Sequence, residues 1–259
     1  MDCGLEHDVE LLRDGGLCLS GRVAYGVVLV GGLATECRNT MGNAMSLPVP
    51  YYDEDGITIF HGDCRDILPH LPKVDLVLTD PPYGIRWDGR VKPGSINGQG
   101  GTFSRFEGQT IAGDDTDFDA SFLLDRGTVI LWGMNHFPQY LHRGSIFVWV
   151  KKYPEAFGTF LSDADVAWMN KGHGVYLSPT VNPASFQHER EHPTQKPVSV
   201  MQWCIEQANT PGIILDPFMG SGTTLRAAKD LGRKAIGIEI EKKYCEIAVE
   251  RLRQTVLPL

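Results

Sequence analysis

The feature that most constrains the fold is an alternation of short apolar runs with helical patterns, which begins near residue 51. Seven runs have the length and composition of strands: 57–61, 74–79, 128–132, 145–150, 164–169, 212–215 and 234–239. Several of them are apolar almost throughout, which is typical of strands covered on both faces of a sheet.

Helical patterns separate some of these runs. Residues 198–208 carry apolar side chains at the spacing i, i+3, i+4, i+7, and residues 244–252 carry them at the similar spacing i, i+3, i+4, i+8. Residues 223–231 are a third predicted helix, followed by Gly232, a residue type that often follows a helix. This alternation predicts a doubly wound α/β fold with a mainly parallel sheet, and such sheets bind ligands at the carboxyl ends of their strands.

The chain is expected to contain one domain and a leader. Residues 1–45 hold eight glycines and no sustained period, so we predict a poorly ordered leader there and a single domain at 46–259. Residues 84–113 also hold eight glycines and few apolar side chains. A loop of this length inside a domain is usually functional, and we predict a mobile loop at 84–113.

Composition excludes several other classes of protein. The longest apolar run near the start, 23–34, is shorter than the roughly 20 residues of a membrane span. The six cysteines include no C-x-x-C pair, which indicates reduced thiols and a cytoplasmic protein. His188 and His192 have a metal-like spacing, but Pro193 interrupts any helix there, so no metal is predicted.

The segment "IILDPFMGSGTT" at 213–224 is typical of a strand, a glycine turn and a helix start. Glycines let the backbone approach a ligand closely, and the helix that follows presents free N–H groups. A phosphate-binding loop needs a lysine where this turn has Gly222. The carboxylates of Asp216 and Glu239 instead suit a ligand with an ammonium group and ribose hydroxyls.

Three segments together resemble one enzyme family: "DPPY" at 80–83, "HPTQKP" at 192–197 and "DPFMGSGTT" at 216–224. The family is the S-adenosylmethionine-dependent DNA amino-methyltransferases, in the permuted β-type arrangement common in restriction-modification systems and phages. The resemblance extends from about residue 51 to 253. It implies a Rossmann-like sheet of seven strands, mainly parallel with one antiparallel strand, which the chain enters at the third strand.

The resemblance also implies S-adenosylmethionine as the cofactor. Asp63 lies where the family contacts the adenine amino group, Glu239 where it contacts the ribose. The residues implied for cofactor binding are Asp63, Thr194, Lys196, Asp216, Phe218, Gly220, Gly222, Thr223 and Glu239. The alternative for Asp63 is that it is an ordinary turn residue without a ligand contact.

The "DPPY" segment supplies the chemistry that methylation of an amine requires. The carboxylate of Asp80 and the carbonyl of Pro81 would each accept a hydrogen bond from one N–H group of the amine. Together they would stabilise its developing positive charge. Pro82 stiffens the turn, and Tyr83 offers a ring to a flipped-out base. Family usage favours adenine N6 when the first residue is Asp. Cytosine N4, an RNA base and a non-catalytic cofactor-binding DNA module are the open alternatives.

Double-stranded DNA is the expected partner, although the formal net charge is −8. A short target-recognition segment is expected at about 151–191, which suggests a short site, relaxed preference or recognition shared across a homodimer. A cognate restriction enzyme cannot be inferred from one chain. The DNA-binding candidates are Arg86, Arg90, Lys92, Arg105, Lys151, Lys152, Lys171 and Arg190, with solvated surface charge as the alternative for each.

Overall fold

A computed structural model describes residues 48–88, 108–158, 162–180 and 195–254, and the backbone of two short strands near the start. These strands, β1 (Val9–Leu11) and β2 (Leu17–Leu19), pair antiparallel and were not predicted. The chain divides into two compact units, Met1–Met45 and Ser46–Leu259. Most of the predicted mobile loop and the end of the predicted recognition segment lie outside the described residues.

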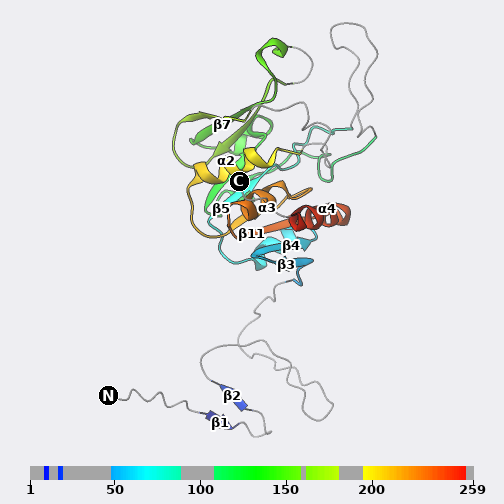
Figure 1. The fold of residues 1–259 in the computed structure, drawn as a ribbon, viewed down its shortest axis with the longest axis vertical. Helices are drawn as coiled ribbons and strands as arrows, with labels where there is room; N and C mark the ends of the chain where they lie inside the picture. The colour runs from blue at the N-terminus through cyan, green and yellow to red at the C-terminus, as the bar shows by residue number, and fades with distance from the viewer. Residues whose placement is uncertain are drawn as a thin grey trace, which may run out of the picture. The chain divides into compact units, whose positions relative to one another are not determined.

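The second unit is built on one sheet (Figure 1). Its strands are β3 (Tyr52–Glu54), β4 (Ile57–His61), β5 (Leu76–Thr79), β6 (Thr128–Trp132), β7 (Ser145–Val150), β8 (Ala164–Met169), β9 (Val175–Leu177), β10 (Ile214–Asp216) and β11 (Ala235–Glu239). Its α-helices are α1 (Cys64–Ile67), α2 (Val198–Ala208), α3 (Thr223–Asp230) and α4 (Lys242–Arg253). Its 3-10 helices are η1 (Leu68–His70), η2 (Ser121–Leu123), η3 (Met134–His136), η4 (Pro138–Tyr140) and η5 (Pro154–Ala156).

The strand order is β3-β4-β11-β10-β5-β6-β8-β7-β9. The five strands from β4 to β6 in this order are parallel, while β8 runs antiparallel to both β6 and β7. All seven predicted runs are strands, and the prediction of a doubly wound, mainly parallel α/β sheet is confirmed. The described sheet has nine strands rather than seven, because β3 and β9 extend its two edges.

The additional strand β3 is part of a tight hairpin with β4. Asp55 and Gly56 connect the two strands, and both have positive φ, 52° and 77°. Such turns favour Asp-Gly because their twist matches that of the paired strands. The Asp-Gly pair therefore indicates β3, although β3 is not an apolar run. Because β3 pairs antiparallel with β4, it is a second antiparallel strand of the sheet.

The sheet buries apolar side chains on both faces. Leu76 and Leu78 belong to a core shared with α2, α3 and α4, whereas Val77 between them belongs to a second core on the opposite face with α1. This alternation follows from the two-residue period of a strand. The helix α2 has the bounds predicted from its apolar spacing and ends at Asn209, a residue type that tolerates its positive φ of 44°. None of the described helices is long and apolar enough to cross a membrane.

Candidate active site

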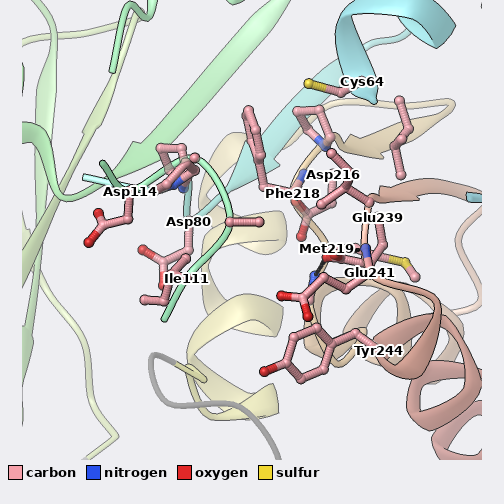
Figure 2. Close-up of a pocket in the computed structure, with 18 of the residues that line it drawn as sticks. Cys64, Asp80, Ile111, Asp114, Asp216, Phe218, Met219, Glu239, Glu241 and Tyr244 are labelled. Atoms are coloured by element: carbon pink, nitrogen blue, oxygen red, sulfur yellow. Dashed lines mark hydrogen bonds between the residues drawn. The ribbon is translucent and has the colours of Figure 1, made fainter. Parts of the chain in front are cut away.

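Four carboxylates lie at the carboxyl ends of four neighbouring parallel strands. Glu239 and Asp216 are the last residues of β11 and β10, Asp80 directly follows β5, and Asp63 follows β4 by two residues. All of them line one pocket with a volume of about 230 Å³. Figure 2 shows Asp80, Ile111 and Asp114 on one side of this pocket and Glu239, Glu241 and Tyr244 on the other, with Phe218 between them.

Glu239 is held by the backbone on its side of the pocket. Its Oε2 accepts a hydrogen bond from the N–H of Gly220 at 2.9 Å, and its Oε1 accepts one from the N–H of Glu241 at 2.7 Å. Burial raises the pKa of Glu239 to about 7, although these two N–H groups act in the opposite direction. Each oxygen keeps a second lone pair, so the carboxylate can accept further hydrogen bonds when it is ionised.

Asp216 is 3% exposed and is fixed by its own turn. Its Oδ1 accepts hydrogen bonds from the hydroxyl of Thr79 at 2.6 Å and from the N–H of Phe218 at 3.1 Å. Burial raises the pKa of Asp216 to about 6. A pocket with several carboxylates favours a cationic ligand and disfavours a phosphate.

The structure places the other predicted cofactor residues as follows. Asp63, Lys196, Phe218, Gly220 and Thr223 line the pocket. Asp63 also caps α1, because its side chain accepts the N–H of Arg65 at 2.8 Å. Thr194 lies outside the described residues.

Gly222 is not among the residues that line the pocket. It begins α3 with a φ of 77°, and a Cβ at this position would lie 2.7 Å from the Cβ of Ala248. Gly222 therefore permits the close approach of α3 and α4, and its contact with the cofactor stays a prediction.

The carboxylate of Asp80 already has a partner on each oxygen. The hydroxyl of Tyr83 donates to Oδ1, and the ammonium group of Lys196 lies 2.8 Å from Oδ2. Pro81 is buried beside it, and Pro82 also lines the pocket. The predicted catalytic residues are thus brought together, and Lys196, which was predicted to bind the cofactor, lies beside them in the same pocket.

Lys196 is the centre of a buried ion-pair network. Its side chain is 4% exposed, and its Nζ lies 3.4 Å from Oδ2 of Asp165, whose other oxygen lies 2.7 Å from Nζ of Lys151. Burial alone would lower the pKa of Lys196, but the carboxylates of Asp80 and Asp165 raise it well above its usual range. Lys196 therefore keeps a positive charge next to Asp80.

The ring of Tyr83 already has a stacking partner. It lies parallel to the ring of His136, with centroids 4.6 Å apart and an interplanar angle of 12°. Gly133 makes room for it, because a Cβ there would come within 2.1 Å of the Tyr83 ring. Burial and the nearby Asp80 raise the pKa of Tyr83 well above its usual range, so its hydroxyl remains a donor. One face of the ring that was predicted to stack on a base is thus occupied by His136.

The sequence analysis missed two acidic residues near Asp80. Asp165 follows the alternation of β8 onto the same face as Ala167 and Met169, which belong to the core, so an inward-facing acid in an apolar strand was a usable signal. Asp114 is 3% exposed and lines the pocket, although it stands next to Asp115 and close to Asp117 and Asp119 in the sequence. No local pattern distinguishes Asp114 from its acidic neighbours.

The predicted DNA-binding residues have different surroundings. Lys151 pairs with Asp165, and Nζ of Lys152 lies 2.9 Å from Asp163, so both have acidic partners within the chain. Arg86 and Lys171 are exposed. Arg90, Lys92, Arg105 and Arg190 lie outside the described residues.

The described residues contain no cluster of three or more His, Cys, Asp or Glu side chains that could hold a metal ion. His188 and His192 lie outside these residues.

Comparison with known proteins identifies a family. Residues 165–250 match a family described as DNA methylase. The type II methyltransferase M.BglII of Bacillus subtilis is 30% identical over 247 residues, which cover 75% of this chain and 68% of that protein. The type II methyltransferase M.ScaI of Streptomyces caespitosus is 28% identical, with 80% of this chain and 84% of that protein covered.

Solved structures agree with these matches. The complex of M1.HpyAVI with S-adenosylmethionine has a TM-score of 0.52 and 26% identity, and the match covers 76% of this chain and all of that chain. The cytosine-N4-specific PvuII DNA methyltransferase has the same TM-score at 15% identity, covers 78% of this chain and 88% of its own, and shows the shared fold alone. The chain belongs to the DNA methylase family, and it is an S-adenosylmethionine-dependent DNA methyltransferase of the restriction-modification type.

Proposed function

We propose that this methyltransferase acts on the N6 amine of an adenine that is flipped out of duplex DNA. The observation that carries the proposal is the position of Asp80, whose carboxylate lines the same pocket as Glu239 and Asp216. The resemblance in the "DPPY" segment favours adenine, because its first residue is Asp. We also infer that residues 46–259 are the catalytic domain and that residues 1–45 are a leader.

The residues present fit S-adenosylmethionine. When bound, this cofactor supplies an electrophilic methyl group on a positively charged sulfur. Glu239 would accept the ribose hydroxyls, Asp63 the adenine amino group, and Asp216 would favour the cationic end of the ligand. Three further residues that line the pocket would contact the cofactor: Phe218, Gly220 and Thr223. Lys196 lines the same pocket and lies next to Asp80.

Asp80 would activate the amine by accepting a hydrogen bond from one of its N–H groups. The lone pair of an exocyclic amine is delocalised into the ring, and acceptors fixed beside the nitrogen favour the tetrahedral, positively charged form. Lys196 and Tyr83 hold the two oxygens of Asp80 in place, so little reorganisation is needed when the base enters. The carbonyl of Pro81 would accept a hydrogen bond from the second N–H group of the amine.

The flipped base would enter beside aromatic and apolar side chains. Trp87, Ile111 and Phe118 line the pocket together with Asp80. Flipping costs roughly a few kcal/mol, which stacking on such side chains offsets in part. His136 covers one face of the Tyr83 ring, so a base can stack only on the other face. Trp87, Ile111 and Phe118 would therefore supply further contacts to the base.

Sequencing of a host that expresses the protein tests the proposed base. We expect long-read, modification-sensitive sequencing to find N6-methyladenine in a recurring sequence context, and none in a host that expresses Asp80→Ala. Modified cytosine without modified adenine would contradict the base assignment, and modification confined to RNA would contradict the duplex substrate.

The affinity for the cofactor should fall as the pH drops below about 7. Only the ionised carboxylate of Glu239 can accept from both ribose hydroxyls, and its pKa is raised to about 7 in the folded protein. One unit below a pKa only about a tenth of a carboxyl group is ionised, so we expect the Kd for S-adenosylmethionine to rise roughly tenfold from pH 8 to pH 6. Titration calorimetry measures this.

The variant Glu239→Gln is the control for this pH dependence. It should bind the cofactor weakly at both pH values, with most of the pH dependence lost. A wild-type Kd that is constant between pH 6 and pH 8 would show that Glu239 does not bind the ribose through its ionised form.

A further inference from the structure

The main chain that follows Asp80 is folded around a single buried carboxylate, that of Asp114. Oδ1 of Asp114 accepts hydrogen bonds from the N–H groups of Tyr83, Gly84 and Ile85 at 2.9, 2.8 and 3.3 Å. Its Oδ2 accepts the N–H of Trp87 at 2.7 Å. One side chain thus satisfies four main-chain donors of the turn that carries the catalytic segment.

The geometry of this turn matches that of a main-chain anion site. Consecutive N–H groups converge on one anion when neighbouring residues alternate between right- and left-handed conformations. Gly84 and Arg86 have positive φ, 75° and 55°, and the N–H of Arg86 donates to the main-chain oxygen of Asp114 at 2.9 Å. Asp114 therefore occupies, within the chain, the place that a free anion takes in other such sites.

The segment that carries Asp114 also packs closely against the turn. A Cβ at Gly84 would lie 2.7 Å from the main-chain oxygen of Thr116, and a Cβ at Gly113 would lie 3.6 Å from Cγ of Pro82. The pocket is lined by Asp114 itself and by the residues it holds, among them Tyr83 and Trp87. Displacing Asp114 would thus move groups on the catalytic side of the pocket and leave Glu239 and Gly220 in place.

We propose that Asp114 is a positioning residue for methyl transfer, which sets the geometry of Asp80 and Tyr83 through the four N–H groups of the following turn. The inference rests on the proposed role of Asp80. It assigns Asp114 to the catalytic step and not to cofactor binding. Misplacement of a catalytic group by about 1 Å can cost about 100-fold in rate.

Asp114→Asn tests the proposal by replacing one acceptor oxygen with an amide donor that faces N–H groups. We expect kcat to fall about 10- to 100-fold, while the Kd for S-adenosylmethionine stays within about twofold of the wild-type value. Asp115→Asn makes the same change of charge at the exposed neighbouring residue and should leave both values unchanged. An unchanged kcat in Asp114→Asn, or a parallel loss of cofactor affinity, would overturn the proposal.

Asp114→Ala adds a readout that separates positioning from general stability. Removing the carboxylate leaves room for a small anion among the four donors, so added formate should restore part of kcat in a saturable manner, and chloride at equal ionic strength should not. If this variant does not fold, the result for Asp114→Asn decides. A folded variant that formate does not rescue contradicts the anion role.

The same assays identify the nucleoside that the wild-type protein methylates, which tests the base assignment separately. If that nucleoside is cytosine, the base assignment fails, while the ratio of variant to wild-type kcat still decides the role of Asp114.

Discussion

Replacing Asp80 with asparagine is expected to lower kcat for methyl transfer by about 100- to 1,000-fold, with little change in the Kd for S-adenosylmethionine. Removing one preorganised electrostatic partner of a transition state typically costs this much. The neutral amide keeps the size of the side chain but cannot balance the positive charge that develops on the amine. Single-turnover transfer to duplex DNA measures the rate, and calorimetry measures cofactor binding.

Asp53→Asn is a matched control for this substitution. Asp53 also accepts a hydrogen bond from a hydroxyl, that of Thr58 at 2.9 Å, but it is exposed on the edge strand β3. This variant should keep the wild-type kcat. If Asp80→Asn also kept it, the catalytic assignment of the "DPPY" segment would be untenable.

Replacing Lys196 with methionine is expected to have the largest effect on stability. Lys196 is nearly fully buried between Asp80 and Asp165, so its loss leaves two carboxylates without their common partner. Removing one member of a buried ion pair costs about 3–5 kcal/mol in the free energy of unfolding. Urea unfolding monitored by circular dichroism measures this loss.

Lys242→Met provides the comparison for a solvent-exposed pair. Lys242 lies 3.7 Å from Glu246 on the surface of α4, and both side chains are more than half exposed. Its removal should cost less than about 0.5 kcal/mol. Equal losses in the two variants would contradict the view that the Lys196 network is a buried, energetically coupled part of the active site.

The framework of the sheet could be predicted because its strands are buried on both faces and are therefore almost continuously apolar. The edge strands β3 and β9 lack this signature. β9 is exposed at all three of its residues, and only one residue of β3, Tyr52, is buried. β3 is specified by the turn that joins it to β4, and β9 pairs with β7, whereas runs of apolar residues report neither a turn nor a pairing.

The site could be predicted in part for a related reason. Asp80, Asp216 and Glu239 each end a recognisable strand, so the sequence itself brings them to one edge of the sheet. The partners of Asp80 are different, because Lys196 and Asp165 are distant in the sequence. Asp165 approaches through the pairing of β8 with β6, and Lys196 through the packing of α2, which follows it, on the face of the sheet. Asp114 acts on backbone N–H groups, and any sequence can supply those donors.

The most direct test of the account is the identity of the nucleoside that receives the methyl group. Purified protein, S-adenosylmethionine labelled in its methyl group and duplex DNA would be incubated together, and the DNA would be digested and separated into nucleosides. We predict label in N6-methyl-deoxyadenosine from the wild type and at least about 100-fold less label at early times from Asp80→Asn. Label in N4-methyl-deoxycytidine alone would contradict the assignment of adenine N6.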